Sequence, residues 1–399
     1  MTNKKICILT TVHPAFDPRI FHKQAKTLVK AGYDVSLIVQ HDKNKIVDGI
    51  KIIALPKTKN RLQRMLRLPL RALHLSLEQK ADVYHFHDPE LIPVGVVLKT
   101  LGKKVIYDVH EDYAKQILSK EYLPKTTRNS IAIFFNTLDH IFSSFFDGIV
   151  TATDDILKNF SSHKKAVSLR NFPIISNYPN IDRNSNSKKN VFNLIYSGVL
   201  VARRGITQIV QALELIDSKK QLKLTLCGKF NPPEYAEEVE SLERFEKVEY
   251  LGWVDPYAIP KLLRRSEVGI INFLPEPNHM KAMPNKLFEY MEASLAVIAS
   301  NFPLWKKIVE GNKCGVCVDP LKPKDIAKAI EYLMEHPKLR KEMGENGRNA
   351  VLDRYNWEKE SEKLIDLYGE LLKNTHLTIY LYHSCVSKQK NTMVSTLIR

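Results

Sequence analysis

A small group of polar residues stands at the start of the stretch Pro284–Ser300, which reads PNKLFEYMEASLAVIAS. Its apolar spacing predicts a short helix with Leu287 on the buried face, followed directly by a buried strand. Asn285, Glu289 and Glu292 recur at the spacing of the opposite face. The stretch therefore places a carboxylate about one turn inside a helix, where it can accept hydrogen bonds from the hydroxyl groups of a ligand.

The beginning of this helix is suited to binding an anion. Pro284 fits the first helical turn, where no hydrogen bond is lost, and Lys286 adds a positive charge there. The free N–H groups of a helix N-terminus favour a negative charge by about 0.3–1 kcal/mol. The pattern predicts a phosphate at the helix tip and a polyol beside Glu289, although an ordinary amphipathic helix with a solvated Glu has the same spacing.

A second group of candidate anion ligands lies in the segment Ile195–Leu213, which reads IYSGVLVARRGITQIVQAL. The segment is typical of a strand, a loop and a helix, and Gly198 permits a tight exit from the strand. Arg203 and Arg204 are fixed-charge donors that could bind a diphosphate. A pair of solvated arginines at a helix start is the alternative interpretation.

Histidines and carboxylates end two neighbouring predicted strands, in the sequences YHFHDPE and YDVHEDY. Side chains at the carboxyl ends of parallel strands converge on one edge of the sheet. Imidazole and carboxylate groups bind several metal ions, but a site needs about three ligands that face one point. His85 and His87 share one face of a strand, and nothing in the sequence fixes His110 beside them. We therefore predict no metal site.

The loop after the first predicted strand reads TTVHPAFDPRIFHK and has an informative composition. A dinucleotide-binding loop needs a GxGxxG pattern here, yet the chain has no glycine from Ile6 to Ala31, which disfavours a nicotinamide or flavin enzyme. The polar groups that the loop offers are His13, Asp17 and Arg19. A loop in which Asp17 merely caps the following helix is the alternative.

Strand and helix patterns alternate along the chain, which predicts parallel sheets covered by helices. We expect one Rossmann-like domain over residues 1–180 and a second over 190–355, joined by the polar stretch Ser176–Asn190. A further helix is predicted over residues 356–374, and residues 375–399 carry no usable pattern. The predicted class is α/β, with two domains whose sheets face each other across a cleft.

Charge and cysteine content limit the possible binding partners and the cellular location of the protein. Of the net charge of +16, residues 1–175 carry +11, from 27 basic and 16 acidic residues. Such a basic half could meet nucleic acid, an anionic membrane or phosphorylated molecules. An odd number of cysteines and the lack of an apolar leader before Ile6 favour the cytoplasm. The most apolar stretch, Ile131–Val150, is interrupted by Asp139 and predicts a core helix rather than a membrane span.

The segment over residues 51–77 combines basic residues with leucines at helical spacing, and it contains no acid. Its basic residues are Lys51, Lys57, Lys59, Arg61, Arg64, Arg67 and Arg71. Its apolar residues at helical spacing are Leu62, Met65, Leu66, Leu70, Leu73 and Leu77. Such a helix can lie in the headgroup layer of an anionic membrane, or it can be a core-facing helix with a solvated basic face. Nucleic acid is disfavoured, because no aromatic residues lie among the charges.

Three motifs of the sequence resemble one enzyme family. The run KLFEYM followed by AVIAS, the pair Arg204-Gly205, and VEYLGWVD at Val248–Asp255 are similar to the donor site of the family 4 retaining glycosyltransferases. The resemblance covers about residues 5–373 and implies the GT-B fold. It also implies that residues 356–374 form the helix that crosses back to the first domain.

The resemblance assigns roles at the donor site. It implies that Glu289 holds the ribose of a nucleotide sugar and that Trp253 and Val254 flank the base. Arg204 and Lys286 would stabilise the departing diphosphate. The implied donor-binding residues are Gly198, Arg203, Arg204, Trp253, Val254, Asn285, Lys286, Leu287 and Glu289. A departure from the family is Lys281, which stands where a Glu usually contacts the sugar.

The resemblance also implies a reaction. Sugar would pass from a nucleoside diphosphate sugar to a hydroxyl with retention, as in a hexosyltransferase-type enzyme, without a metal or other cofactor. His110 would hold the donor sugar as a catalytic residue beside Arg204 and Lys286, and His13, Asp17 and Arg19 would line the acceptor side. A lipid-linked or glycan acceptor at the cytoplasmic face of the membrane, in surface polysaccharide biosynthesis, fits the basic charge. A sugar-nucleotide epimerase and a nucleic-acid-binding protein are the alternatives.

Overall fold

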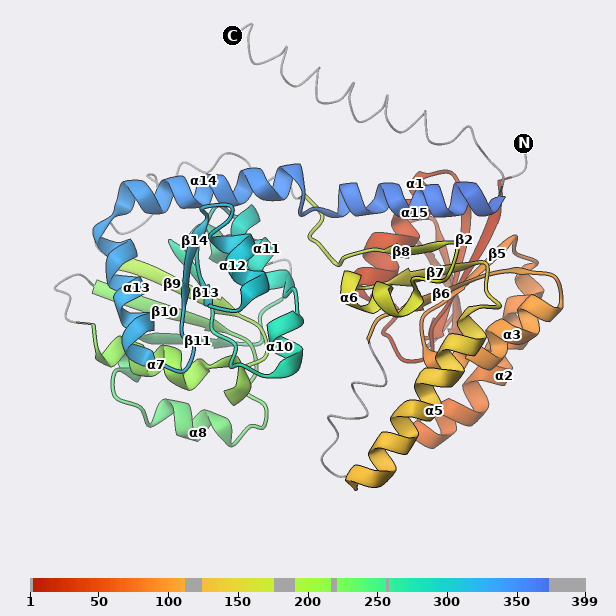
Figure 1. The fold of residues 1–399 in the computed structure, drawn as a ribbon, viewed down its shortest axis with the longest axis horizontal. Coiled ribbons are helices and arrows are strands. Elements are labelled where there is room, and N and C mark those ends of the chain that lie inside the picture. The colour runs from red at the N-terminus through yellow and green to blue at the C-terminus, as the bar shows by residue number, and fades with distance from the viewer. Residues whose placement is uncertain (1–2, 112–123, 176–190, 217–220, 256–257, 373–399) are drawn as a thin grey trace, which may run out of the picture. The chain divides into compact units, whose positions relative to one another are not determined.

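Two sheets, parallel except for one edge strand, organise the chain, as Figure 1 shows. The computed structural model describes residues 3–111, 124–175, 191–216, 221–255 and 258–372. They divide into two units, of which unit 1 contains the described residues up to Asn171 and those from Trp357 onward, and unit 2 runs from Phe172 to Asn356. The predicted linker, Ser176–Asn190, and the tail 375–399 lie outside the described residues.

The sheet of unit 1 has the strand order β3-β4-β2-β1-β5-β6-β7-β8, and only β3 runs antiparallel to its neighbour. Its strands are β1 (Lys5–Leu9), β2 (Asp34–Gln40), β3 (Lys45–Val47), β4 (Ile50–Leu55), β5 (Val83–Phe86), β6 (Lys104–Val109), β7 (Gly148–Thr151) and β8 (Ala166–Ser168). The winding direction reverses at β1, between β2 and β5. Loops that leave the carboxyl ends of β1 and β5 therefore separate there, which leaves room for functional groups.

Helices cover both faces of this sheet (Figure 1). They are η1 (Pro18–Ala25, a π-helix), α1 (Lys26–Lys30), α2 (Arg61–Gln79), η2 (Pro89–Leu91), α3 (Ile92–Thr100), α5 (Lys125–Ser143), α6 (Asp154–Leu157), η3 (Lys158–Phe160) and α15 (Trp357–Leu372). The expectation of one core helix over Ile131–Val150 is wrong, because α5 ends at Ser143 and the buried strand β7 begins at Gly148. In the described part of the chain, no helix is both long enough and apolar enough to span a bilayer.

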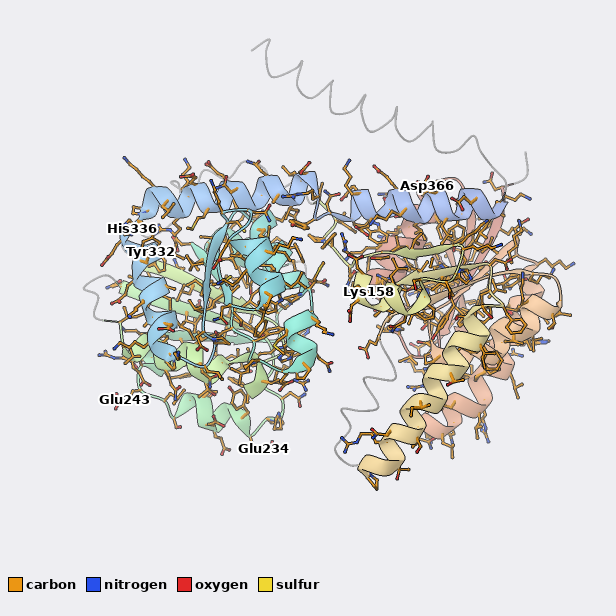
Figure 2. The ribbon with its side chains drawn as sticks, in the orientation of Figure 1. Lys158, Glu234, Glu243, Tyr332, His336 and Asp366 are labelled. Atoms are coloured by element: carbon orange, nitrogen blue, oxygen red, sulfur yellow. The ribbon has the colours of Figure 1, made fainter. Side chains whose placement is uncertain are left out.

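Helix α15 follows unit 2 in the sequence but packs in the core of unit 1. Leu364, Leu367 and Tyr368 are buried on its inner face, whereas Asp366 points away from the sheet (Figure 2). The indole N–H of Trp357 donates to Oγ1 of Thr27, 2.9 Å away, at the start of the helix. The apolar spacing of α15 thus fixes which of its faces covers the sheet.

The sheet of unit 2 has the order β11-β10-β9-β12-β13-β14, with every pairing parallel. Its strands are β9 (Val191–Ser197), β10 (Gln221–Cys227), β11 (Val248–Gly252), β12 (Val268–Ile271), β13 (Ala296–Ser300) and β14 (Gly315–Val318). This order is that of the doubly wound nucleotide-binding folds, in which ligands bind where the winding reverses. Here the reversal lies at β9, between β10 and β12.

The helices of unit 2 enclose a continuous apolar core that includes Trp305, Phe288 and Tyr290. They are η4 (Ala202–Arg204), α7 (Ile206–Glu214), α8 (Tyr235–Glu240), η5 (Phe245–Lys247), α9 (Ile259–Arg264), α10 (Pro277–Lys281), α11 (Asn285–Glu292), α12 (Pro303–Val309), α13 (Pro323–Glu335) and α14 (Pro337–Asp353). The core holds the backbone of β9 and of α11 in fixed positions, and these two elements carry the candidate site.

Candidate functional site

Two cationic side chains meet at Gly198, directly after the central strand β9 of unit 2. A Cβ atom at Gly198 would lie 2.6 Å from Cε of Lys286 and 3.2 Å from Nη1 of Arg204. Neither cation forms an ion pair with a residue that the structure describes, and bringing two unpaired like charges together is unfavourable unless an anion joins them. The structure thus brings together three residues that the sequence analysis names as donor-binding, Gly198, Arg204 and Lys286.

Three glycines let the backbone fold tightly around this point. Gly228, after β10, has φ +152°, and a Cβ there would lie 1.8 Å from the carbonyl oxygen of Gly198. Gly205, at the start of α7, has φ +65°, and a Cβ there would lie 2.1 Å from the carbonyl oxygen of Asn272. These contacts leave no room for a side chain, so the loops after β9 and β10 pack backbone against backbone. Gly228 is a site residue that the sequence analysis missed, although its place directly after an apolar strand was a usable signal.

Arg204 is held in place by neighbours within unit 2. Its Nη1 donates to the carbonyl oxygen of Val199 at 3.2 Å, and its guanidinium lies 5.2 Å from the ring centroid of Phe273. A guanidinium over an aromatic ring keeps its charge while losing freedom of movement. Arg203, by contrast, is exposed. No contact in the described part of unit 2 brings the Arg203 side chain to Gly198.

Helix α11 presents Glu289 from the same edge. Pro284 forms its cap rather than its first turn, no side chain caps the N-terminus, and Leu287 is fully buried. Glu289 is half-buried. The expectation that Glu292 shares its face is wrong, because Glu292 is buried at the end of the helix, where Arg348 donates to its carbonyl oxygen at 2.8 Å.

Tyr290 ties α11 to the end of β9. Its ring is fully buried, and its hydroxyl accepts a hydrogen bond of 2.8 Å from the backbone N–H of Ser197, the residue before Gly198. Gly269 leaves space for the ring, since a Cβ there would lie 2.2 Å from it. Burial raises the pKa of the Tyr290 hydroxyl, which therefore stays protonated. The sequence analysis missed this residue, because a buried Tyr in a helix gives no signal of its hydrogen bond.

The predicted base-binding residues follow β11 at the edge of the same sheet. Trp253 is 64% exposed, and Val254 is half-buried against the core. An exposed indole is a large apolar surface that can stack on a planar ring. The structure therefore leaves the Trp253 ring accessible, and its partner stays a prediction.

In unit 1 the corresponding edge is built from buried ionisable groups. Asp108, in β6, is fully buried and accepts hydrogen bonds from Nη2 of Arg19 at 3.0 Å and from Nε2 of Gln24 at 2.6 Å. Burial opposes the negative charge, but Arg19 and the nearby histidines outweigh it and hold the pKa of Asp108 well below its usual range. The Arg19 guanidinium, expected on the acceptor side, points inward and also donates to the carbonyl oxygen of Leu169.

His110 lies at the end of this buried network. Its Nε2 is 3.0 Å from Nδ1 of His87 and 3.7 Å from Oδ1 of Asp108, so the structure does fix it beside His87, contrary to the sequence analysis. Burial, together with the positive potential of His87 and Arg19, lowers the pKa of His110 to about 3 despite Asp108. His110 is therefore a neutral imidazole at physiological pH, able to offer one donor or acceptor nitrogen to a ligand.

His13 and Asp17 lie beside His110 on the first loop. Nδ1 of His13 is 3.6 Å from Oδ2 of Asp17, and the rings of His13 and His110 are 4.7 Å apart. Asp17 also caps η1 by accepting hydrogen bonds from the N–H groups of Arg19 and Ile20, as the alternative interpretation of the loop expected. Burial disfavours both charges, yet their pairing raises the pKa of His13 and lowers that of Asp17 to about 2.

The geometry also identifies a group of possible metal ligands, His85, His87 and Asp108, whose ligand atoms lie within 4.8 Å of one another. Nε2 of each histidine is buried without a hydrogen-bond partner in the described part of the chain. Arg19, however, already donates to both oxygens of Asp108. Arg19 therefore already balances the charge of this carboxylate, which disfavours a cation beside it, and the absence of a metal ion stays a prediction.

Comparison with family models assigns the chain to an enzyme family. A model described as Glycosyltransferase Family 4 matches residues 19–178, and one described as Glycosyl transferases group 1 matches residues 177–350. Together they cover residues 19–350, which include parts of both units. The chain belongs to this glycosyltransferase family. The predicted enzyme class, a glycosyltransferase of the hexosyltransferase type, is confirmed.

Curated relatives carry the same class name. The glycosyltransferase is 23% identical to the uncharacterized glycosyltransferase MJ1607 of Methanocaldococcus jannaschii over 313 residues, which cover 72% of this chain and 75% of the relative. It is 24% identical to CapM of Staphylococcus aureus, a capsular polysaccharide biosynthesis glycosyltransferase, over 189 residues. The CapM match covers 46% of this chain and 47% of that relative, so the chain spans about half of its length.

Solved structures confirm the predicted GT-B fold. A sucrose-phosphate synthase from Thermosynechococcus elongatus matches with a TM-score of 0.73 at 17% identity, over 94% of this glycosyltransferase and 100% of that chain. Anabaena HepE in complex with UDP-glucose matches with a TM-score of 0.67 at 15% identity, over 92% and 99% of the two chains. At these identities the likeness establishes the fold, and the site residues rest on the geometry above.

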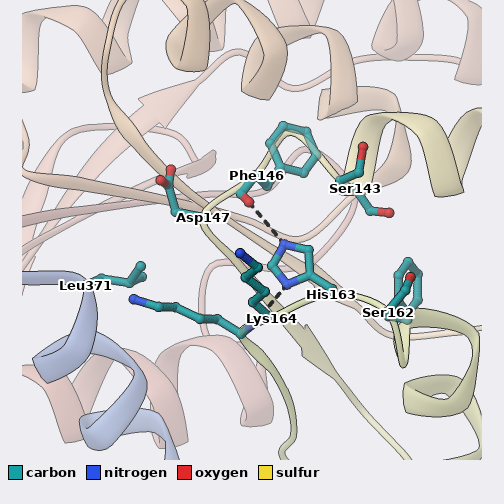
Figure 3. Close-up of a pocket in the computed structure, with 10 residues that line it drawn as sticks. Ser143, Phe146, Asp147, Ser162, His163, Lys164 and Leu371 are labelled. Carbon is teal, nitrogen blue, oxygen red and sulfur yellow. Dashed lines mark hydrogen bonds between the residues drawn. The ribbon is translucent and has the colours of Figure 1, made fainter.

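The glycosyltransferase also has a cavity of about 420 Å³ in unit 1, away from these residues (Figure 3). Asp147 and Lys165, which line it, precede β7 and β8, so it lies at the amino edge of the sheet. His163 is fixed there, with Nε2 donating to the carbonyl oxygen of Phe146 at 3.0 Å and Nδ1 accepting from the N–H of Lys165 at 3.1 Å. Both ring nitrogens are therefore used within the fold, and the cavity is not the candidate site.

Proposed function

We propose that this glycosyltransferase moves a sugar from a nucleoside diphosphate sugar to a hydroxyl group, with retention at the anomeric carbon and without a metal ion. The observation that carries the proposal is the meeting of Arg204 and Lys286 at Gly198. The two cations lie at the point of the sheet where this fold class binds ligands, beside a helix N-terminus that no side chain caps. The structure of HepE in complex with UDP-glucose supports a donor of this kind.

The chemistry expected of these residues is electrostatic. As the bond between the sugar and the diphosphate breaks, negative charge grows on the leaving group, and Arg204 and Lys286 stabilise it. Glu289 accepts hydrogen bonds from the ribose hydroxyls, and the neutral His110 offers a hydrogen-bonding nitrogen to the sugar. In this mechanism no covalent intermediate is formed, and the attacking hydroxyl transfers its proton to the departing diphosphate.

The acceptor is proposed to be a lipid-linked sugar in surface polysaccharide assembly. The name of CapM, a capsular polysaccharide biosynthesis enzyme, supports this setting, as does the net charge of +11 on residues 1–175. His13 and Asp17 lie 3.6 Å apart on the loop after β1, and polar groups of this kind suit the recognition of acceptor hydroxyls.

The first test is thermal-shift screening of the full chain against UDP, GDP, ADP, CMP and dTDP. A nucleotide at about 100 times its dissociation constant should add about 2.7 kcal/mol to stability. We expect one diphosphate to stabilise the protein and Glu289→Ala to abolish the effect. Glu243→Ala is the matched control, because Glu243 is exposed. It lies away from α11, as a comparison of Figure 2 with the labels of Figure 1 shows. No shift with any nucleotide, or an equal loss in the control, would contradict the assignment.

The second test identifies the reaction. Incubation of the matching nucleotide sugar with a lipid-linked sugar acceptor should give a new glycosidic bond, whose anomeric configuration is read by NMR. Retention of the donor configuration is the expected result. An inverted product would overturn the proposed mechanism, and an altered free sugar formed without acceptor would overturn glycosyl transfer itself.

A further inference from the structure

Helix α2 of unit 1 is apolar on two opposite faces. Its inner face packs on the sheet through Leu68, Ala72 and Leu75, which are 1%, 0% and 8% exposed. Its outer leucines are Leu62, Leu66, Leu70 and Leu77, which are 67%, 63%, 73% and 37% exposed. The interpretation of the apolar residues as a core-facing stripe is therefore wrong for these four leucines, whereas Leu73 is half-buried and does pack against the core.

The outer leucines form one continuous stripe, which we call the α2 outer face. At 3.6 residues per turn, Leu62, Leu66, Leu70 and Leu77 fall within an arc of about 80°. They extend over about 22 Å of the helix at 1.5 Å per residue. Exposed apolar surface of this length on a charged, helical element is typical of a docking surface.

Two exposed arginines border this face, and Glu78, which lies on the same side at the end of the helix, pairs with His74 at 3.1 Å. Arg67 and Arg71 are exposed, and neither has an ion-pair partner among the described residues. Arg64 does not belong to the border, because its Nε and Nη2 donate to Glu90 at 3.1 and 3.3 Å. Lys51 and Lys57 likewise pair with Asp34 and Asp42. Among the basic side chains of α2 that the structure describes, Arg67 and Arg71 are thus the two without an ion-pair partner, and both lie beside exposed leucines.

We propose that the α2 outer face binds the surface of a bilayer that contains anionic lipids. A helix that lies in the headgroup layer inserts its leucines among the acyl chains and places its basic residues at the lipid phosphates. Arg67 and Arg71 provide that charge complementarity, and no acid lies between Asp48 and Glu78 to oppose it. The inference goes beyond the proposed reaction, because docking requires neither donor nor acceptor.

Two other occupants fit the same face less well. A second copy of the chain, docked on α2 through a two-fold axis, would bring the arginines of both copies together, and the single acid of α2, Glu78, already pairs with His74. Nucleic acid would leave the leucines in water, and α2 has no Phe, Tyr or Trp on which a base could stack. These alternatives are therefore outcomes of the experiment rather than proposals.

The experiment is co-sedimentation of the full chain with vesicles of phosphatidylcholine, alone or mixed with phosphatidylglycerol. We expect binding to the mixed vesicles and a decrease of about tenfold or more in the partition coefficient for Leu66→Gln with Leu70→Gln. Leu62→Gln with Leu77→Gln is the second variant if the first does not fold. The matched control is Ile46→Gln with Leu101→Gln, since these residues of unit 1 are 70% and 54% exposed on other elements.

The contribution of charge is tested separately. Arg67→Gln with Arg71→Gln should reduce binding to the mixed vesicles and weaken its salt dependence. The control is Lys43→Gln with Lys158→Gln, two exposed lysines on other surfaces of unit 1, and Figure 2 labels Lys158. Equal binding of the wild type and the leucine variant would overturn the proposal. A dimer that light scattering detects and the leucine variant abolishes would overturn it in favour of a second copy.

Discussion

The carboxyl edges of the two sheets are built from opposite kinds of residue. In unit 1, Asp108, His87 and Arg19 are buried and bonded to one another, so the charges there are balanced by the fold itself. In unit 2, Gly198 and Gly228 clear the space around Lys286 and Arg204, whose charges the described residues of that unit leave unbalanced. The charges at the edge of unit 1 are therefore balanced by its own residues, whereas the cations at the edge of unit 2 need an anionic ligand to balance them.

The largest expected effect is the loss of charge balance in unit 1. Asp108→Asn keeps the shape of the side chain but leaves Arg19 as a buried, unpaired cation, which should cost about 3–5 kcal/mol of unfolding free energy. Urea denaturation measures this change. Asp48→Asn, which breaks the exposed pair with Lys26, should leave stability nearly unchanged. If the two variants were equally stable, Asp108 would not be the centre of the network.

A comparable change in unit 2 should affect catalysis rather than stability. Lys286→Met removes one of the two cations at Gly198 and should lower kcat/KM by about 10²-fold, or about 3 kcal/mol, mainly through kcat. Its melting temperature should not decrease, because the charge that it loses is unpaired in the described part of that unit. Lys261→Met, at an exposed position of α9, is the control and should keep wild-type kinetics. A stability loss without a kinetic effect would mean that Lys286 is structural.

The glycines of unit 2 provide a sharper test of close packing at its edge. Gly228→Ala forces a Cβ to within 1.8 Å of the carbonyl oxygen of Gly198, at φ +152°, and should cost about 2–3 kcal/mol of stability. Gly102→Ala also has a positive φ, +73°, but meets no atom within 4 Å. It should cost only about 1 kcal/mol. Equal costs in chemical denaturation would show that backbone strain, not packing, explains Gly228.

The smallest expected effect is on the pH dependence of stability, through the partly buried pair of His13 and Asp17. The pKa of Asp17 is lowered to about 2, below the unfolded value of 3.8, so its contribution to stability is present above pH 3.8 and lost as the pH falls toward 2. The pKa of His13 is raised, so its contribution is present below pH 6.5 and lost as the pH rises through the folded pKa. The pair should therefore be strongest between about pH 4 and 6.5.

Asp17→Asn retains the helix cap and removes only the charge of this pair. We expect it to lower the unfolding free energy by about 1 kcal/mol near pH 5, after allowance for solvent screening, and by nothing near pH 2. Denaturation curves recorded across this pH range measure the difference. A constant difference at all pH values would indicate a loss of capping instead of a loss of charge.

Much of the architecture could be predicted from the sequence, because apolar periodicity is a local property of the chain. The helix and the buried strand predicted within Pro284–Ser300 are α11 and β13, and the helix predicted over residues 356–374 is α15, Trp357–Leu372. The short strands β3 and β8 were missed, because three residues carry too little pattern to distinguish them from loops. The π-helical start of η1 was also outside what spacing can indicate.

The residue types that the site needs can be identified from local sequence pattern: a glycine after an apolar strand, Arg204 before Gly205, and Lys286 with Glu289 on a short helix. Local pattern does not say which of them meet, because strand order and helix packing bring together residues that are far apart in the chain. The tertiary structure joined Lys286 to Arg204, buried Glu292 and Arg19, and linked His110 to His87. It also turned the leucines of α2 outward, since the spacing of an apolar stripe does not specify which of two apolar faces meets the core.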